Sequence, residues 1–349
     1  MNEKIILSYD EQIKFLRDKG VTFEHDYSEE KAKTYLEAHN SLFRLKAYLK
    51  NFKDFGSDTY RGTEFSYLVD LSEIDLALRH LLLEMSIAVE HFSKMHLLYL
   101  VTEHYPDEKA WGLIEEYYRS LSAVSKERID SMLSSYSQSP HTCGLFDKYA
   151  YESMGKMCFN RLPIWAYLEV ISFGNFTYFY RFCTRQMGLK NGDKKIFYLL
   201  RTVKNARNGA AHDSLFLSEL RSVNPPIEKR EELLDSIKID IQKSISPTYT
   251  ATKDLSSINS IYKNQKICEI ITCFYAYKEL IISTTSRRYT SFIHPYEKLP
   301  QNLLESLEQF EKQLSNFIKE VPDSLDYKFR PVRSIFIFLQ LLLTFWFLR

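Results

Sequence analysis

The feature that most limits the fold is a long stretch without helix breakers. Residues 64–104 contain neither glycine nor proline, and the whole chain of 349 residues has only 10 of each. Apolar side chains recur in this stretch every three or four positions, at Leu68, Leu71, Ile74, Leu78, Leu81, Leu82 and Met85. That spacing places them on one face of a helix. The pattern predicts one long helix here and, since strand signals are weak elsewhere, an all-α fold.

Helical periodicity covers most of the remaining chain as well. Further helices are expected over residues 30–52, 108–119, 126–136, 162–171, 176–187, 194–218, 229–244, 265–283 and 301–318. Breaks that contain polar residues, glycine or proline are expected over 56–62, 137–144, 172–175, 189–193 and 223–226. We divide the chain into an N-terminal helical extension (1–60), a helical core (61–222) and a C-terminal helical region (223–349).

Charge and cysteine usage exclude several classes of protein. The net charge is +1, so the chain is not a strongly basic protein that coats duplexes, and any contact with nucleic acid must be a local patch. The five cysteines show no C-x-x-C pairing, which is typical of reduced thiols in the cytoplasm. The first residues lack the apolar core of a signal peptide. We therefore predict a cytoplasmic protein.

The last residues form a separate apolar run. Residues 334–348 are apolar except for Ser334, Gln340 and Thr344. A helix that crosses a bilayer needs roughly 20 apolar residues, and this run is shorter. The run therefore predicts a buried terminal helix or strand, with contact to a membrane or a partner as the alternative.

One hexapeptide, Arg207–His212 (RNGAAH), carries the residues best suited to chemistry. Arginine binds phosphate with a planar fork of donors, and histidine exchanges protons near neutral pH. On a helix, Asn208 and His212 lie one turn apart on the same face, with Arg207 at its edge. Such groups can cut RNA without a metal ion, so we take Arg207, Asn208 and His212 as candidate catalytic residues.

The surroundings of the hexapeptide are small and basic. Gly209 within a helix costs about 1 kcal/mol relative to alanine, so it indicates a packing need. The small side chains from Gly209 to Ala211 would let a second backbone or an RNA strand come close. The same helix offers basic residues as candidate RNA contacts: Lys194, Lys195, Arg201 and Lys204. The structural alternative is an ordinary ion pair for Arg207 and a capping or packing role for His212.

With Phe216 following it, the hexapeptide resembles the R-N-x-x-A-H signature of HEPN-superfamily ribonucleases. The wider chain resembles the Abi-like (AbiD/AbiF) abortive-infection branch of that superfamily. Three other segments carry this resemblance in the family's order: Asn40–Tyr48, Asp75–Leu83 with Glu90 following, and Leu162–Asn175. The resemblance implies a HEPN-like helical bundle with N- and C-terminal helical extensions.

The resemblance also implies a reaction. Arg207 would neutralise the scissile phosphate, His212 would act as general base or acid, and Asn208 would orient the phosphate or the histidine. The ribose 2′-oxygen would attack phosphorus, leaving a cyclic phosphate and a 5′-hydroxyl, with no metal or other cofactor. RNA is the expected partner, as substrate and as a structured noncoding or antitoxin RNA. One histidine does not readily serve both sides of phosphorus, and the family pairs two motifs across a two-fold interface, so a homodimer is expected.

Other polar groups suggest weaker sites. His80, Glu84 and His91 share a helical stripe, but the third is too distant to share a metal ion, so we favour a polar stripe and no metal site. Glu90 and His91 are candidates for supporting the catalytic helix. The spacing of Asp75 and Arg79 predicts an ion pair within one helix. A second arginine–histidine group, which precedes a proline and is interpreted as a loop, comprises Arg287, Arg288 and His294.

An aromatic cluster lies beside Arg181 and Arg185, and it comprises Trp165, Phe173, Phe176, Tyr178, Phe179 and Tyr180. Core packing is the favoured interpretation, with stacking of unpaired bases as the alternative.

Three functions therefore compete. The favoured one is a metal-independent endoribonuclease that acts as an anti-phage toxin. The second is a non-catalytic RNA-binding protein that forms a complex with a structured noncoding RNA. The third is a membrane-associated effector that uses the tail from Ile335.

Overall fold

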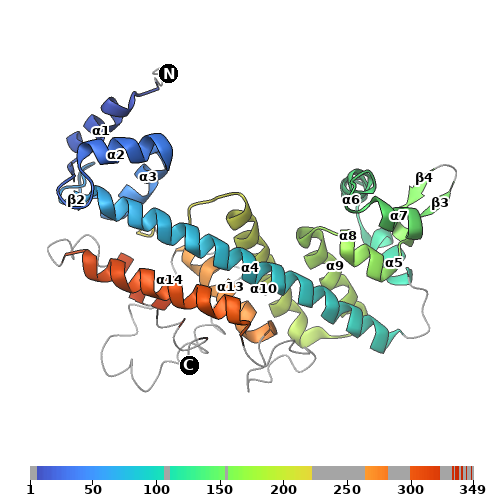
Figure 1. Ribbon diagram of the computed structural model, residues 1–349. Coiled ribbons are helices and arrows are strands. Elements are labelled where there is room, and N and C mark those ends of the chain that lie inside the picture. The colour runs from blue at the N-terminus through green and yellow to red at the C-terminus, as the bar shows by residue number, and fades with distance from the viewer. Residues whose placement is uncertain are drawn as a thin grey trace, which may run out of the picture. The chain divides into compact units, whose positions relative to one another are not determined.

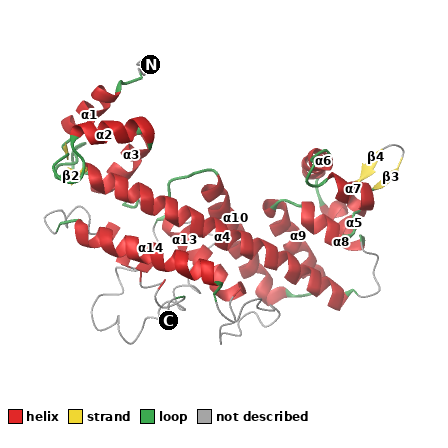
Figure 2. Ribbon diagram, in the orientation of Figure 1, coloured by secondary structure: helices red, strands yellow, loops and turns green. Residues whose placement is uncertain are grey.

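The computed structural model describes residues 6–105, 111–153, 156–221, 264–281 and 299–322, together with single residues between 332 and 347. The side chains of residues 151–156 and 190–195 are outside this description. Helices dominate the described residues, and the sheets are two short two-stranded pairs (Figures 1 and 2). The predicted all-α class is confirmed.

The chain folds into two compact units, and both are discontinuous in sequence. The first contains residues 1–85, 205–278 and 298–349, and the second contains residues 86–204 and 279–297. Among the described helices, α4, α10 and α13 contribute residues to both units.

The first unit begins with short helices and a small sheet: α1 (Tyr9–Asp18), β1 (Val21–Thr22), α2 (Glu29–Ala38), α3 (Leu42–Leu49), η1 (Lys50–Phe52) and β2 (Thr63–Glu64). Serine caps set the starts of the helices, since the hydroxyls of Ser8, Ser28 and Ser41 each accept a hydrogen bond from a backbone N–H three residues on. The single helix predicted over 30–52 is wrong, because the cap at Ser41 starts a new helix. β1 and β2 pair in parallel, with Val21 opposite Thr63.

The predicted long helix is confirmed as α4 (Phe65–His104). The apolar stripe that predicted it is buried, including Leu68, Leu71, Leu78 and Leu82. In the first unit, α14 (Gln301–Glu320) runs antiparallel to the first half of α4 (Figure 1). Near its start Asn302 donates to Glu84, and near its end the Phe317 ring contacts that of Tyr67.

The second unit holds the middle of the chain: α5 (Gly112–Ser120), α6 (Ala123–Ser137), α7 (Cys143–Tyr149), β3 (Tyr151–Ser153), β4 (Lys156–Cys158), η2 (Phe159–Arg161), α8 (Ile164–Val170) and α9 (Phe173–Gln186). β3 and β4 pair antiparallel, with Glu152 opposite Met157. The stop predicted at 172–175 is instead a helix start, because the Ser172 hydroxyl caps the Asn175 N–H.

α10 (Lys190–Ala211) carries the hexapeptide. The turn predicted over 189–193 is wrong: α9 ends at Gln186, Gly188 follows with a φ of +73° that suits glycine, and α10 begins two residues after Gly188. The predicted end of this helix at residue 218 is also wrong by seven residues.

The C-terminal region completes the core of the first unit. α13 (Gln265–Ile281) is confirmed close to its predicted bounds, and Cys273 contacts the Leu82 carbonyl of α4. The predicted buried tail is confirmed for most of its described residues: Ile335, Phe336, Leu339, Leu343 and Phe347 are buried and most of them are helical, whereas Ile337 and Gln340 are half-buried. No helix in the described part of the chain combines the length and apolarity needed to cross a membrane. The predicted helix at 229–244 and the group of Arg287, Arg288 and His294 lie outside the described residues.

Candidate functional site

The hexapeptide forms the C-terminal end of α10, and a tight reversal follows it. The Ser214 N–H donates to the Gly209 carbonyl at 2.9 Å, and the Asp213 N–H donates to the Ala210 carbonyl at 3.3 Å. Asp213 takes the left-handed conformation at φ 57°, which completes a Schellman motif. Because the backbone turns back here, α10 stops at Ala211 and leaves His212 in the capping position.

The three candidate catalytic residues keep the predicted order along the helix. The His212 N–H still donates to the Asn208 carbonyl at 3.0 Å, so the two residues remain one turn apart. One Arg207 guanidinium nitrogen, Nη1, donates to the Asn208 side-chain oxygen at 3.2 Å. Arg207 is half-buried and its Nε is buried without a hydrogen-bond partner among the described residues, whereas His212 is exposed. Arg207 and Asn208 therefore form a contacting pair, and His212 lies on the solvent side of the helix end.

Gly209 lies where packing within the chain leaves little room for a side chain. A Cβ at this position would lie 3.0 Å from Cζ of the Phe216 ring. Phe216 is buried, and it lies seven residues further along, in the segment that folds back on α10. The prediction that this glycine marks a packing need is confirmed, and the neighbour it admits is a ring of the same chain.

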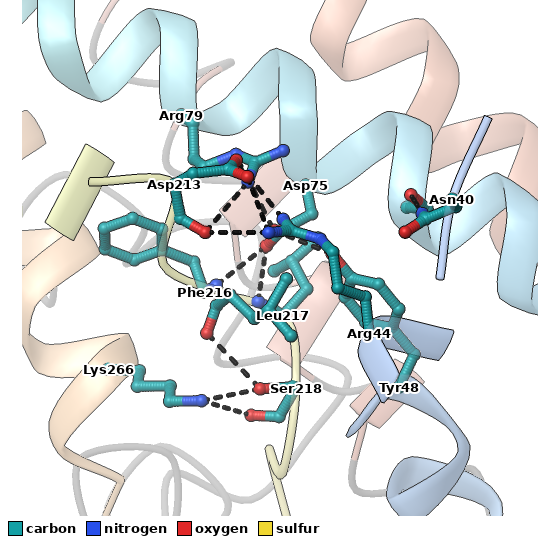
Figure 3. Close-up of polar contacts among 12 residues, drawn as sticks. Asn40, Arg44, Tyr48, Asp75, Arg79, Asp213, Phe216, Leu217, Ser218 and Lys266 are labelled. Atoms are coloured by element: carbon teal, nitrogen blue, oxygen red, sulfur yellow. Dashed lines mark hydrogen bonds and ion pairs between the residues drawn. The ribbon is translucent and has the colours of Figure 1, made fainter. Parts of the chain in front are cut away.

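A buried carboxylate anchors the segment that folds back. Asp75 of α4 is completely inaccessible to solvent, and its Oδ1 accepts hydrogen bonds from the Phe216 and Leu217 N–H groups at 2.9 and 2.7 Å (Figure 3). The Tyr48 hydroxyl of α3 donates to Oδ2 at 2.9 Å. One side chain from the long helix thus fixes the two backbone amides that follow the hexapeptide.

Two arginine side chains bind the carboxylate of Asp213, the residue that follows the hexapeptide (Figure 3). Arg44 of α3 donates to both carboxylate oxygens of Asp213, at 2.6 and 3.2 Å, and to its carbonyl at 3.1 Å. Arg79 of α4, only 7% exposed, forms an ion pair with the same carboxylate. The predicted ion pair between Asp75 and Arg79 is confirmed at 3.9 Å. We refer to Arg44, Tyr48, Asp75, Arg79 and Asp213 together as the Asp75 cluster.

Electrostatics within this cluster follow from burial. Loss of water raises the pKa of the Asp75 carboxyl above its ordinary value, while the hydrogen bonds from Leu217 and Tyr48 and the charge of Arg79 oppose that shift. Burial, followed by the charge of Asp75, also raises the pKa of Tyr48. The tyrosine hydroxyl therefore stays protonated and remains a donor to the carboxylate.

Further side chains fix the backbone beyond Phe216. The Asn51 amide donates to the Leu217 carbonyl at 2.7 Å and accepts from the Leu220 N–H at 2.9 Å. From α13, the Lys266 ammonium donates to the carbonyl and hydroxyl of Ser218 at 3.0 and 2.7 Å (Figure 3). The end of α10 is thus held by residues far away in sequence, from α3, η1, α4 and α13.

The predicted RNA contacts are distributed along the earlier part of α10. Lys194 and Lys195 lie in its first turns, and their side chains are outside the described residues. The Arg201 guanidinium lies 5.6 Å from the Phe197 ring centre and 5.9 Å from that of Tyr178. The Lys204 stem lies beside Gly174. These residues belong to the second unit, whereas Arg207, Asn208 and His212 belong to the first.

The remaining candidates on α4 have other contacts. Glu90 pairs with Lys94 at 3.0 Å, and His91 is exposed with its ring against Phe92. Glu84 accepts from Asn302 at 2.7 Å, and His80 is exposed. Across the described residues there is no group of three side chains arranged to hold a metal ion.

The aromatic cluster divides between core and surface. Phe173, Phe176, Phe179 and Tyr180 are buried, which confirms core packing for these four. Trp165 and Tyr178 are exposed, at 45% and 50%.

Sequence reasoning missed most of the Asp75 cluster. It identified Asp75 and Arg79 only as a local pair, and it predicted neither the contact of Arg44 with Asp213 nor that of Tyr48 with Asp75. A weak signal was available, because a buried-face position of a long apolar helix is an unusual place for an acidic residue. Its partners could not be found in this way, since they lie 27 to 142 residues away.

Comparison with known proteins bears on this region directly. A family model described as Abi-like protein matches residues 34–218, which spans α3, α4, the hexapeptide and the backbone held by Asp75. A search of curated proteins and a search of solved structures each found no match. The matched segment covers more than half of the chain and ends where the polar contacts to the helix end occur. The chain belongs to the Abi-like protein family.

Proposed function

We propose that this chain is a metal-independent endoribonuclease of the HEPN type, and that it acts as an abortive-infection toxin against phage. Membership of the Abi-like family supports the abortive-infection role. The chemistry of Arg207, Asn208 and His212 at one helix end supports the nuclease activity.

In the proposed reaction, His212 exchanges protons with the ribose 2′-hydroxyl or with the leaving 5′-oxygen. Arg207 neutralises charge on the phosphate as the 2′-oxygen attacks phosphorus. Asn208 holds the guanidinium of Arg207 through its side-chain oxygen and so orients it. The products are a cyclic phosphate and a 5′-hydroxyl, and all atoms come from the RNA.

The observation that carries this proposal is that an exposed imidazole and a partly buried guanidinium both belong to one fixed helix end. His212 occupies the capping position of α10, next to Asp213, which two arginines hold. A proton-transfer group at a rigid position needs little reorganisation to act.

The proposal includes a homodimer with a composite site. One histidine cannot readily act on both the nucleophile and the leaving group, which lie on opposite sides of phosphorus. Two copies of His212 across a two-fold axis would supply both roles. Light scattering of the purified chain, with and without RNA, tests this part.

The decisive experiment compares cleavage of total RNA by the wild type, His212→Ala and Arg207→Ala, with a chelator present throughout. We expect wild-type cleavage to survive the chelator and each variant to lose at least about 100-fold, the usual contribution of a proton-transfer group. The products should carry cyclic phosphates, and DNA should stay intact. His80→Ala, an exposed histidine elsewhere, is the matched control. Equal activity of His212→Ala and the wild type would refute the proposal.

The second candidate is a non-catalytic protein that binds a structured noncoding RNA. It is favoured by a pocket lined by arginines and aromatic rings in the second unit, which contains none of the hexapeptide. This function predicts stable RNA binding without turnover and no effect of His212→Ala on binding.

A further inference from the structure

A pocket in the second unit, which we call the arginine pocket, has no role in the proposed reaction. Its volume is about 460 Å³, within the range typical of small-ligand sites. Residues of α5, the start of α6 and α9 line it: Tyr117, Ser120, Arg128, Asn175, Tyr178, Arg181 and Arg185 are among them. The walls therefore combine cationic, aromatic and neutral polar side chains.

The charged side chains in the described lining of this pocket are all arginines, so its charge is positive. No aspartate or glutamate occurs among its lining residues in the part of the chain that the structure describes. Neither Arg128 nor Arg181 has an ion pair with any described residue. The Arg181 Nε is buried and has no hydrogen-bond partner among the described residues, and its guanidinium stacks on the Phe197 ring at 4.5 Å. Such a cavity favours an anion, and arginine's planar fork favours a phosphate.

The rings supply a second kind of recognition. Tyr178 lines the pocket and is 50% exposed, so an aromatic ligand can reach it. On the inner side, the Tyr117 ring packs against Phe182 at 5.3 Å. Burial raises the pKa of Tyr117 to about 12, so its hydroxyl remains a donor at neutral pH. Asn175 and Ser120 add neutral polar groups at the wall, suited to the edges of a base.

We infer that the arginine pocket binds one nucleotide of a single-stranded RNA, with its phosphate held by Arg128 and Arg181 and its base stacked on Tyr178. The choice of RNA as the source of the nucleotide rests on the proposed function. The site itself requires only a phosphate attached to an aromatic base. Arg201, predicted from the sequence as an RNA contact, lies beside the same Tyr178 ring.

The test measures binding without cleavage. Fluorescence anisotropy with a labelled single-stranded 2′-O-methyl oligonucleotide, which lacks a free nucleophile, reports the affinity of the full chain. We expect Arg128→Gln and Tyr178→Leu each to weaken binding about fivefold to tenfold, as loss of a phosphate contact or a stacking ring does. Tyr178→Phe keeps the ring and should bind within twofold of the wild type.

Arg119→Gln is the matched control, since Arg119 is an exposed arginine of the same unit that pairs with Glu115 at 3.0 Å. The affinity of the Arg119→Gln variant should stay within about twofold of the wild type, because a single charge far from the bound phosphate contributes little at physiological salt. Unchanged binding in both Arg128→Gln and Tyr178→Leu would overturn the inference, as would an equal loss in Arg119→Gln. Binding of AMP without measurable binding of the oligonucleotide would overturn the assignment to an RNA strand.

This result is separable from the nuclease proposal. His212→Ala should bind the oligonucleotide as the wild type does, because His212 is not part of the pocket. If His212→Ala cleaves RNA normally while the pocket variants bind weakly, the proposed function fails and the pocket stands. If cleavage depends on His212 and the pocket variants bind normally, the pocket fails alone.

Discussion

Two groups of arginines in this protein are used in opposite ways. In the Asp75 cluster, Arg44 and Arg79 both contact the carboxylate and the carbonyl of Asp213. In the arginine pocket, Arg128 and Arg181 face a cavity whose described lining residues include no carboxylate. The first pair of charges is satisfied within the chain, and the second is available to an anion from outside.

The contrast shows which charges stabilise the fold and which are suited to a ligand. Charges paired with a backbone segment fix that segment, because breaking them leaves buried groups without partners. Charges beside a cavity without an acid contribute little to folding and attract an anion. Three predictions test this division, beginning with the largest effect.

Asp75→Ala should cost the most stability. The substitution removes the acceptor for the Phe216 and Leu217 N–H groups and for the Tyr48 hydroxyl. We expect a loss of about 3 kcal/mol in the free energy of unfolding, since buried donors without partners each cost about 1–3 kcal/mol. Urea denaturation followed by circular dichroism measures it. Asp75→Asn keeps an acceptor oxygen and should cost less; a loss below about 1 kcal/mol for alanine would contradict the anchoring role.

The stability losses of Arg79→Gln and Arg128→Gln should differ between the Asp75 cluster and the arginine pocket. Arg79 is nearly buried and holds Asp213, so its substitution should cost about 2 kcal/mol of stability. Arg128 is exposed at the arginine pocket, so its substitution should stay within about 0.5 kcal/mol. Thermal denaturation of both variants under identical conditions gives the comparison. Equal losses in melting temperature would mean that the pocket arginine is structural as well.

Substitutions of Asp213 should have the smallest effects on stability. They distinguish the contribution of its backbone conformation from that of its carboxylate. Its φ of 57° disfavours alanine, whereas asparagine tolerates the left-handed conformation. We expect Asp213→Ala to cost about 1–2 kcal/mol and Asp213→Asn less than about 1 kcal/mol. The carboxylate is 64% exposed, so the ion pairs themselves contribute modestly. If asparagine costs as much as alanine in urea denaturation, the charge and not the conformation dominates.

Much of the helical fold could be predicted from the sequence. Periodicity found α4, α6, α13 and α14 close to their observed bounds, because each has a continuous apolar face of the right spacing. The errors fell at interruptions. The serine caps at Ser41 and Ser172 start helices, yet a serine within an apolar pattern does not by itself show whether it caps a helix or faces solvent.

The residues of the candidate site could be predicted from the sequence, but the side chains that hold them in place could not. Arg207, Asn208 and His212 could be chosen because their chemistry is local to one hexapeptide. The end of α10 at Ala211 could not be predicted. Asp213 is not a glycine, and its left-handed conformation depends on two arginines from other helices. The role of Gly209 was predictable as packing, but its neighbour Phe216 was not.

The sequence by itself determined that this chain is helical, that it joins an arginine, an amide and a histidine within one turn and a half of helix, and that it has a buried apolar tail. These properties are local, because they depend on the spacing of side chains along one segment. Only the tertiary structure decided where that helix ends, which distant carboxylate holds the following backbone, and that three arginines gather at a pocket whose described lining contains no acidic residue. Those outcomes depend on which segments meet in space, and side chains more than a hundred residues apart leave no shared pattern in the chain.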